Sequence, residues 1–382
     1  MDRSSLPRGG TTSDTASRRK LVEKKTGVKL KHTSSHSFEP ESASRNVENF
    51  IGVTQIPLGI AGPLRVRGEY ARGDFFIPLA TTEAALVATI NRGCSVVTES
   101  GGALVRVTKD AMTRAPVFRT EGIEHGILVS EWVSGNFRKL QAVARSTTRH
   151  GRLLSAATSM TGKTLFVRFS FSTGDAMGMN MATIASQKMC DLIERETGAK
   201  TISVSGNMCV DKKPSAMNFI EGRGKTVLAE AVIPERIVKT KLHSTSAEIV
   251  DTSIRKNMTG SAMSLSYGFN SHFANMAAAM FIATGQDAAQ VVEASMGISL
   301  AEKTDGGLYM SVRLPALEVG TVGGGTSLPT QAEALRMIGC SGSGYAVKLA
   351  EIMGSVILSG ELSTLAAQSK GELAAAHARM AR

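Results

Sequence analysis

Two adjacent lysines in a proline-bounded stretch are the residues of this sequence best suited to polar chemistry. Lys212 and Lys213 follow Asp211 and precede Pro214 in the segment SGNMCVDKKPSAMNF. In a dry site, a fixed ammonium group stabilises an oxyanion that develops during a reaction. The same pattern also fits a solvated run of charges, since lysine and aspartate usually lie at the surface. The choice between these interpretations depends on the other reactive residues of the chain.

Three further ionisable side chains lie at positions of interest. Glu83 is expected in the first turn of a helix over residues 81–97, where the helix dipole favours a carboxylate. Asp287 lies in an apolar region, where an unpaired carboxylate is costly to bury, although it could also cap the helix that follows Gly285. His377 lies near the C-terminus, and histidine is the side chain that titrates near neutrality. Taken alone, a histidine at this position more often lies on the surface.

Two glycine-containing segments could hold an anionic ligand. GTVGGGT (residues 320–326) has three consecutive glycines, whose main-chain amides can surround an anion, but a structural turn explains it equally well. GDAMGMN (174–180) lies between an expected strand and an expected helix, and a helix N-terminus is a common position for a pyrophosphate. The alternative for this segment is an aspartate cap with methionines in the core.

Two other glycine motifs do not meet the requirements of nucleotide-binding loops. GRGKT (222–226) ends like a P-loop, but Phe219 stands where the first glycine should be, which excludes a nucleoside triphosphate site. GSG (342–344) is followed by Val347 in place of the third glycine of a dinucleotide fingerprint, and no strand is expected before it. A Rossmann fold is therefore weakly supported.

The composition indicates a large globular protein of the reducing cytosol. The chain has 382 residues, of which 42% are hydrophobic, enough for two domains or for one domain with an insertion. Its four cysteines form no CxxC pair, so we expect neither a metal site nor a disulfide framework. No stretch approaches the roughly 20 apolar residues of a membrane span, and the N-terminus lacks the apolar segment of a secretory signal. We therefore expect a cytoplasmic protein without a membrane segment.

The net charge of +11 raises the question of nucleic-acid binding. Residues 1–47 carry ten Lys/Arg and five Asp/Glu, so almost half of the excess lies in this basic leader. Aromatic residues make up only 5% of the chain, and no basic helix or aromatic stacking surface follows the leader. An anionic small substrate that carries phosphates accounts for the remaining charge equally well. We expect no nucleic-acid partner.

The pattern of apolar residues predicts an α+β protein with an inserted domain. The leader is expected to be disordered at first and weakly helical after that. Between about 115 and 203, three strand-like runs, GILVSEWV, KTLFVRFSF and KTISVS, surround two helices at 138–147 and 179–196. The C-terminal part has helices rich in small residues, and we expect them to pack tightly at 272–283, 287–296 and 345–376.

Seven segments taken together resemble the class I form of 3-hydroxy-3-methylglutaryl-coenzyme A (HMG-CoA) reductase. They are ENFIGVTQIPLGIAGPL, TTEAALVATINRGC, DAMGMN, SGNMCVDKKPSAMNFIEGRGK, GQDAAQ, GTVGGGT and a histidine close to the C-terminus. They follow the order of the family from about Arg18 to Arg382, and several are long enough to be specific. The resemblance is to the soluble form, because the membrane anchor of some relatives is not found in the sequence.

The resemblance implies a large domain around a central helix, with a small ferredoxin-like cofactor domain inserted into it. The expected boundaries are a leader at 1–47, a large substrate domain at 48–114 and 215–382, an inserted NAD(P)-binding domain at 115–204, and a catalytic loop at 205–214. The resemblance also implies a homodimer or tetramer with the active site at the subunit interface.

The activity that the resemblance implies is the reduction of (S)-HMG-CoA to mevalonate and free coenzyme A, with two hydrides from NADPH or NADH. Lys212 would stabilise the oxyanion formed from the thioester carbonyl. Asp287 would form hydrogen bonds between Lys212 and Glu83 and would shift the pKa of both. Glu83 would protonate the aldehyde oxygen, and His377 would protonate the departing coenzyme A thiolate. The paired lysines are then part of a site and not a solvated charge run.

The resemblance also implies a set of binding residues. The expected substrate contacts are Asn91, Arg92, Arg114, Ser205, Asp211, Lys213, Lys256 and Asn275. The expected cofactor contacts are Asp175, Ala176, Met177, Gly178, Met179, Asn180 and Arg382. Relatives that use NADPH often carry Ser-Arg before a phenylalanine, whereas Gly135 and Asn136 precede Phe137 here. Compensation could come from Arg138, Lys139 or Arg382, so NADPH is favoured and NADH stays open.

Two other functions stay open at this stage. The same fold could act mainly in reverse and oxidise mevalonate with NAD, which cofactor preference would reveal. A basic nucleic-acid-binding protein is the alternative from another class, and it predicts that deletion of residues 1–47 abolishes function and that salt weakens binding steeply.

Overall fold

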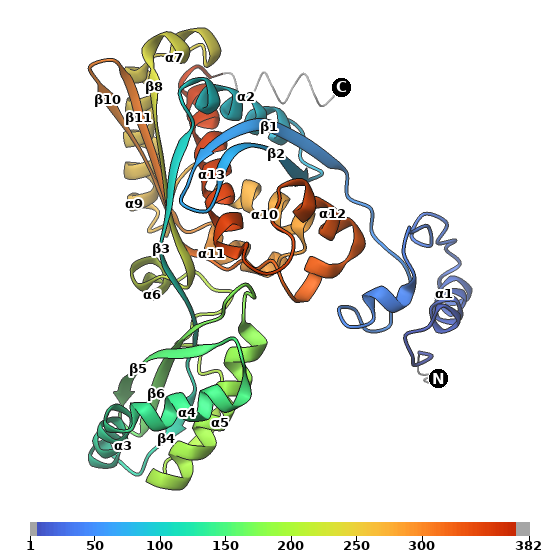
Figure 1. Ribbon diagram of the computed structural model, residues 1–382, viewed down its shortest axis with the longest axis vertical. Coiled ribbons are helices and arrows are strands. Elements are labelled where there is room, and N and C mark those ends of the chain that lie inside the picture. The colour runs from blue at the N-terminus through green and yellow to red at the C-terminus, as the bar shows by residue number, and fades with distance from the viewer. Residues whose placement is uncertain (1–5, 372–382) are drawn as a thin grey trace.

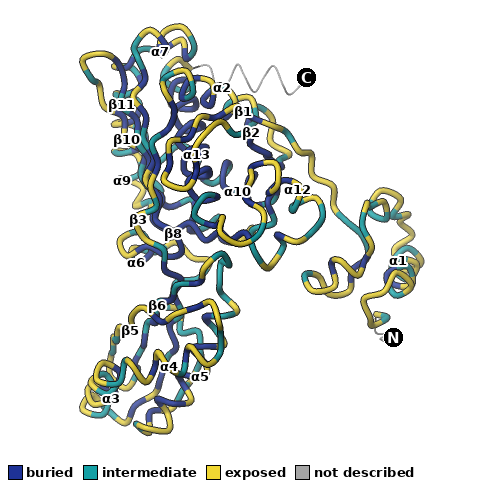
Figure 2. Tube along the Cα trace, viewed as in Figure 1, coloured by how far each residue is buried: buried dark blue, intermediate teal, exposed yellow. Residues whose placement is uncertain are grey.

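The computed structural model describes residues 6–371, which form an N-terminal segment, a large body and a small body. Figure 1 shows the small body below the large one and the N-terminal segment to one side. The two bodies have separate clusters of buried apolar side chains, as the dark blue regions of Figure 2 also indicate. A mixed fold of helices and strands, expected from the sequence, is confirmed.

The N-terminal segment contains α1 (Thr12–Thr26) and a short 3-10 helix, η1 (Pro40–Ala43). A capping box at Thr11 begins α1, because the side chain of this residue accepts from a main-chain amide of the first turn. The buried guanidinium of Arg18 donates to the carbonyl oxygen of Phe50 at 3.1 Å. The leader is therefore helical from Thr12 and packed on the chain that follows it.

The large body contains one part of an 11-stranded sheet. Its strands, in order across the sheet, are β2 (Arg72–Ala80), β1 (Leu58–Arg67), β3 (Ala103–Arg114), β8 (Gly224–Pro234), β11 (Gly307–Leu317), β10 (Gly297–Thr304) and β9 (Gly268–Phe269). The long strand β3 continues into the small body, because residues 104–111 pair with β8 and residues 112–114 pair with β6 (Thr164–Ser172).

The central helix of the large body is α13 (Ala346–Ser369), which packs on β3, β8, β11 and α2 (Leu86–Glu99). Small residues let the two helices approach closely, since a Cβ atom on Gly93 would lie 1.9 Å from the carbonyl oxygen of Ser359. By length and composition α13 resembles a membrane span, but its most apolar stretch is wholly buried inside the protein. Figure 2 shows it as a core helix.

The other helices of the large body surround α13 and the ends of the sheet. They are α6 (Ala216–Glu221), α7 (Glu235–Lys241), α8 (Ser246–Thr252), the π-helix η2 (Ser253–Gly260), α9 (Ser261–Met263), α10 (Phe273–Thr284), η3 (Ala288–Gln290), α11 (Val291–Ala294), η4 (Gly324–Ser327) and α12 (Pro329–Met337). The helix expected at 287–296 is thus two short helices, and the helix expected at 272–283 is α10. The helix expected at 345–376 is α13, which ends at Ser369, and residues 372–376 lie outside the described residues.

The small body has strands of the same sheet and three helices. They are β4 (Val117–Arg119), β5 (Arg152–Thr161), β6, β7 (Lys200–Ser203), α3 (Ile123–Gly135), α4 (Phe137–Thr147) and α5 (Met179–Thr197). The apolar faces of these helices and of β6 form the core of the small body. The expected helices at 138–147 and 179–196 are confirmed as α4 and α5, and KTLFVRFSF and KTISVS contain β6 and β7.

Two local predictions are wrong. GILVSEWV lies in α3 and not in a strand, and its buried Val129 and Val133 have the i,i+4 spacing of a helix face. The helix expected from residue 81 begins only at Leu86, because Ala85 has a left-handed conformation (φ 70°) that interrupts helical geometry. Glu83 therefore precedes α2 and does not lie in its first turn.

Candidate active site

Lys212 lies at an ion pair with Asp287. Its Nζ is 2.8 Å from Asp287 Oδ2, and the side chains are 43% and 31% exposed, so the pair is accessible from solvent. The hydrogen bond to Asp287 raises the pKa of Lys212 above its ordinary value. Asp287 also caps η3, since its Oδ1 accepts from the amide of Ala289 at 3.1 Å. The carboxylate thus has the capping role considered from the sequence and a lysine partner as well.

Asp211 ties the loop of residues 205–214, which we call the lysine loop, to buried groups. Its Oδ1 lies 3.1 Å from Arg223 Nη2 and accepts from Gln290 Nε2 at 3.0 Å, and its Oδ2 lies 3.9 Å from Arg114 Nη1. The structure therefore brings the two expected substrate residues Arg114 and Asp211 together. Lys213 Nζ donates only to the carbonyl oxygen of Asp211, at 3.3 Å, among the contacts of the described residues.

Three fully buried charged side chains lie next to Asp211, and we call them the buried charge cluster. They are Arg223, Glu293 and Glu318. Arg223 Nη1 lies 2.7 Å from Glu318 Oε1 and 3.3 Å from Glu293 Oε1. Burial raises the pKa of Glu293 to about 7 and that of Glu318 well above its ordinary value. Sequence reasoning missed this cluster, although an arginine inside the GRGKT segment was a visible signal.

Glu83 and Asn275 form a second expected group. Asn275 Nδ2 donates to both carboxylate oxygens of Glu83, at 3.0 and 2.9 Å. Within residues 6–371, Glu83 forms no hydrogen bond or ion pair with Lys212 or Asp287. Glu83 and Lys212, which are expected to act together, therefore have different contact partners among the described residues of one chain.

A cavity of about 440 Å³ lies beside Asn275, lined also by Pro214, His272 and Met296. His272 was not expected at the site; its Nε2 contacts Thr364 Oγ1 and the carbonyl oxygen of Gly360. A histidine just before an apolar helix was the available signal. This cavity extends from the end of the lysine loop to the Glu83–Asn275 pair, so it is the best candidate for the acyl substrate.

Lys256 lies on the π-helix η2, and such wide helices are frequent at functional sites. Burial lowers its pKa, and its Nζ donates to Asn257 Oδ1 at 3.0 Å. Asn91 and Arg92 are placed differently. Asn91 Oδ1 accepts from the amide of Gly62 at 2.9 Å, and Arg92 donates to Ser363 of α13 through two nitrogens. Ser205 lies at the start of the lysine loop, with its Oγ 3.9 Å from Cys209 Sγ.

The expected cofactor segment is held against the large body. Asp175 accepts from the amides of Gly344 and Ala346, at 2.7 and 3.1 Å, so it caps the start of α13 and not its own helix α5. Ala176 pairs with Val322 of the GTVGGGT segment. The four residues that follow, Met177, Gly178, Met179 and Asn180, lead into α5, and Arg223 Nη2 donates to Met179 Sδ at 2.8 Å.

The GTVGGGT segment is both a packing element and an open loop. A Cβ atom on Gly285 would lie 2.3 Å from the carbonyl oxygen of Gly325, so this glycine allows a close backbone approach just before Asp287. Gly323 and Gly324 have positive φ angles, 79° and 54°, and a Cβ on either would meet no described atom within 4 Å. This part of the loop leaves room for a ligand against its main chain.

A basic loop between α4 and β5 lies beside the start of α5. Arg145, Arg149, His150 and Arg152 line a cavity of about 600 Å³, and among the described residues none of them forms an ion pair. The loop contacts α5 near the cofactor segment, because Gly151 packs against Met181. Sequence reasoning missed this loop, although RSTTRHGR has four basic side chains in eight residues.

The position where the sequence suggested recognition of the NADPH phosphate lies at the other end of α4. Gly135, Asn136 and Phe137 begin this helix, and Lys139 Nζ is 3.0 Å from Glu196 in the last turns of α5. Since α4 and α5 pack side by side, the start of α4 lies far along α5 from Asn180. Arg138 and Lys139 therefore lie at the end of α4 opposite to the basic loop. His377 and Arg382 lie outside the described residues.

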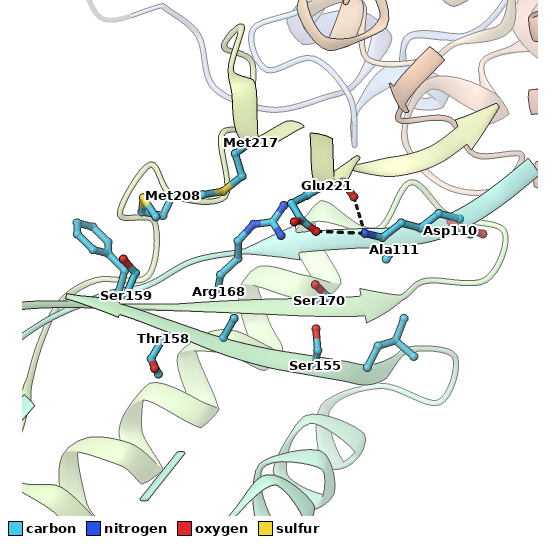
Figure 3. A pocket seen from close by; sticks show the side chains of 14 residues that line it. Asp110, Ala111, Ser155, Thr158, Ser159, Arg168, Ser170, Met208, Met217 and Glu221 are labelled. Atoms are coloured by element: carbon cyan, nitrogen blue, oxygen red, sulfur yellow. Dashed lines mark hydrogen bonds and ion pairs between the residues drawn. The ribbon is translucent and has the colours of Figure 1, made fainter. Parts of the chain in front are cut away.

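A third cavity, of about 540 Å³, opens on the sheet of the small body where it meets the large body (Figure 3). It is lined by Lys109, Arg168, Met208, Met217 and Glu221 among others, and Lys109 Nζ lies 3.8 Å from Glu221 Oε2. None of the expected site residues that the structure describes lines it.

Comparisons with known proteins agree on one family. The model of the family described as hydroxymethylglutaryl-coenzyme A reductase matches residues 14–382. The chain is 52% identical to 3-hydroxy-3-methylglutaryl-coenzyme A reductase of Methanocaldococcus jannaschii, over 98% of this chain and 94% of that one. It is 52% identical to the enzyme of the same name from Pyrococcus abyssi, over 96% of this chain and 92% of that one. It is 42% identical to 3-hydroxy-3-methylglutaryl-coenzyme A reductase 1 of Dictyostelium discoideum, over 94% of this chain and 67% of that one.

The fold is also similar to a solved structure. The class II 3-hydroxy-3-methylglutaryl-CoA reductase of Streptococcus pneumoniae bound to NADPH matches with a TM-score of 0.71 and 19% identity, over 92% of this chain and 96% of that one. At this level of identity the likeness extends to the fold alone.

Proposed function

The chain belongs to the hydroxymethylglutaryl-coenzyme A reductase family, and from this premise we propose that it reduces (S)-HMG-CoA to mevalonate and coenzyme A with two NADPH. The observation that carries the proposal is the Lys212–Asp287 ion pair, in the loop whose Pro214 lines the candidate substrate cavity. NADPH supplies the two hydrides. The overall change turns a thioester carbonyl into a primary alcohol, takes up two protons and releases the thiol.

Lys212 stabilises negative charge on the acyl oxygen. A carbonyl that accepts hydride becomes an oxyanion, and an ammonium group within hydrogen-bond distance lowers the energy of that state most where water is excluded. The pairing with Asp287 raises the pKa of Lys212 and keeps the amine protonated at neutral pH. Collapse of the oxyanion breaks the C–S bond and gives an aldehyde, and His377 protonates the departing thiolate.

The second reduction needs a proton on the aldehyde oxygen, and we assign it to Glu83. Asn275 orients this carboxyl group through both oxygens. Lys256, Lys213 and Arg114 supply positive charge for the terminal carboxylate of the substrate, and Ser205 and Asp211 bind its hydroxyl group. Asn91 and Arg92 support the coenzyme A side through the helix that follows Glu83.

The basic loop supports NADPH over NADH. A phosphate at the 2′ position carries charge that NADH lacks, and arginine binds phosphate with paired N–H groups. The side chains of Arg149 and Arg152 line the basic cavity near the cofactor segment Asp175–Asn180, and they have no ion-pair partner among the described residues. We assign recognition of the 2′-phosphate to Arg149, with Arg382 as a further contact.

The assignment to Arg149 is tested by Arg149→Ala. We expect the KM for NADPH to rise about 10- to 100-fold, the size of a lost charge-assisted contact, and the KM for NADH to change by less than about threefold. Arg138→Ala, at the opposite end of α4, is the matched control and should change neither. Equal effects of Arg149→Ala on both cofactors would remove the assignment.

We propose the class I form, as well as a second copy of the chain at the active site. The chain is only 19% identical to the class II structure, and this distance supports class I. Glu83 and Lys212 are not joined by contacts among residues 6–371, which supports completion of the site by a partner. Leu228, Val232 and Leu300 are exposed on the sheet of the large body, where a hollow of about 460 Å³ offers an apolar surface.

Light scattering tests the second copy. We expect a dimer or tetramer in solution, and Leu300→Asp should shift it toward monomer with loss of activity, whereas Ile184→Asp, an exposed residue of α5, should not. An active monomer would rule out a site shared between subunits. We further propose that the protein acts in the cytoplasm, which the burial of apolar α13 inside the fold supports.

The proposed activity itself is tested by following NADPH and NADH absorbance with HMG-CoA, and in parallel with mevalonate, coenzyme A and NAD. We expect HMG-CoA-dependent oxidation of NADPH and one mevalonate for each two NADPH. Faster NAD reduction with mevalonate would favour the oxidising direction instead. His377→Gln should impair reduction of the thioester more than reduction of free mevaldehyde, since only the first releases a thiolate.

A further inference from the structure

The main chain around Lys212 has an unusual conformation. Lys212 has a φ of 57°, and Asn207 (64°) and Val210 (49°) in the same loop also have positive φ angles. For a residue with a side chain, this left-handed conformation costs about 1 kcal/mol or more. Residues in such conformations persist where surrounding contacts hold them. The structure must therefore supply a contact that fixes the backbone of Lys212.

Glu293 supplies that contact. Its Oε1 accepts a short hydrogen bond from the main-chain amide of Lys212. Glu293 lies on α11, and its side chain is fully buried. Among the described residues, its second oxygen, Oε2, has no hydrogen-bond partner. A buried carboxyl group is thus directed at the backbone of the lysine, while Asp287 contacts its side-chain ammonium group.

The other members of the buried charge cluster hold Glu293 in place. Arg223 Nη1 contacts Glu293 and Glu318, and Arg223 Nη2 reaches Asp211, the residue before Lys212. Gln290 Oε1 accepts from the same Nη1 at 3.3 Å. One guanidinium therefore faces three carboxyl groups. With one buried cation among three carboxyl groups, one of these carboxyl groups is favoured to keep its proton.

Charged groups from four segments surround Glu293. They are Arg223 at the start of β8, Glu318 after β11, Asp211 and Lys212 in the lysine loop, and Asp287 before η3 as the ion-pair partner of Lys212. Burial raises the pKa of Glu293 to about 7, while the amide of Lys212 and Arg223 favour its ionised form. An ionised carboxyl group is the stronger acceptor for that amide.

We infer that Glu293 is a positioning residue for Lys212: through the main-chain amide it fixes the backbone that aims the ammonium group at Asp287 and the substrate. The inference rests on the proposed function, in which Lys212 stabilises the oxyanion. It assigns a role to a buried residue that touches neither substrate nor cofactor. Because the contact is to the backbone, it acts mainly on the direction of the amine, while the charge of Glu293 adds to the raised pKa of Lys212.

The test compares Glu293→Ala and Glu293→Gln in the full-length protein. Loss of the acceptor in Glu293→Ala should lower kcat about 10- to 100-fold, the size expected for a hydrogen bond to a charged group, with KM for HMG-CoA within about threefold. Glu293→Gln keeps an oxygen acceptor, so it should recover most of kcat at pH 8. In wild type, kcat should fall as the pH drops below about 7, and Glu293→Gln should lose this step.

Glu351→Ala is the matched control. Glu351 is a fully buried carboxyl group of α13 that accepts from three main-chain amides, those of Glu69, Tyr70 and Ala71. Its removal should lower the thermal unfolding temperature without changing the pH profile of kcat. This control separates the general effect of removing a buried carboxyl group from a specific effect on the orientation of Lys212.

Three outcomes would overturn the inference. They are an unchanged kcat in folded Glu293→Ala, a matching loss of kcat in Glu351→Ala, and retention of the step near neutral pH in Glu293→Gln. If Glu293→Ala does not fold, the pH profile of Glu293→Gln decides alone. Failure of the proposed function is distinguishable, because the wild-type protein would then show no HMG-CoA-dependent oxidation of NADPH at any pH.

Discussion

Glu293 lies beneath Lys212, whereas Glu361 of α13 lies beneath the segment that carries His272 and Asn275. Both are fully buried carboxyl groups that accept from main-chain amides of the candidate site. Glu293 shares one guanidinium with other carboxyl groups and has an oxygen without a partner in the described structure. Glu361 uses both oxygens, and its hydrogen-bond donors are neutral: Asn257, Ser299 and the amides of Ser271 and His272.

This difference separates two ways of supporting a site. A carboxyl group with a shared cation and an unused oxygen can hold or release a proton near neutrality, so the support of Lys212 responds to pH. A carboxyl group surrounded by four donors mainly fixes the shape of the main chain, because each donor would be left unsatisfied without it. The carboxyl group beneath Lys212 therefore responds to pH, and the one beneath the Asn275 segment acts as a structural support.

The largest effect is expected from Lys212→Ala, which removes the ammonium group that Glu293 positions. We expect kcat to fall about 1,000-fold or more, because a preorganised charge on the oxyanion is lost. The fold should be unchanged, since the side chain is partly exposed. Steady-state assays and circular dichroism measure both. Lys213→Ala is the comparison, and it should mainly raise the KM for HMG-CoA.

The second largest effect is expected at Glu361, the carboxyl group beneath the Asn275 segment. Glu361→Ala leaves several buried donors without an acceptor, so we expect the free energy of unfolding to fall by about 3 kcal/mol and the KM for HMG-CoA to rise. Urea unfolding measures the stability. Glu361→Gln, which keeps one oxygen acceptor, should lose less. A Glu361→Ala protein as stable as wild type would contradict the structural role assigned to Glu361, and with it the contrast with Glu293.

The smallest effect is the pH dependence of stability. The pKa of Glu293 is raised in the folded protein, so its proton stabilises the fold at low pH, and this contribution is lost as the pH rises from about 4.5 through about 7. Glu318 has a shift of the same direction. Urea midpoints at pH 5.5 and 8 should therefore differ more in wild type than in Glu293→Gln. An identical difference in both proteins would show that Glu293 does not titrate in this range.

The sequence predicted those parts of the site that lie in contiguous motifs. Lys212 and Asp287 were named from motifs, and the structure places their side chains in contact. The buried charge cluster could not be predicted, because Arg223, Glu293 and Glu318 come together only through the packing of β8, β11 and α11. Charged residues far apart in a sequence give no local sign that they are buried together.

The failures of local prediction have physical causes. GILVSEWV contains apolar residues at both helical and strand spacing, and a short apolar run of this kind does not distinguish the two. The delayed start of α2 at Leu86 depends on the left-handed Ala85, which no residue type at that position announces. The basic loop was overlooked because it is remote in sequence from the cofactor segment, and only the packing of α4 on α5 brings it near.

The small body is attached to the large body by two crossings of the chain: the continuous strand β3 and residues 204–215, which include the lysine loop. The loop is held in the large body by the contacts of Glu293 with the amide of Lys212 and of Arg223 with Asp211. The stretch of chain that joins the two bodies is therefore also the one that carries the ammonium group.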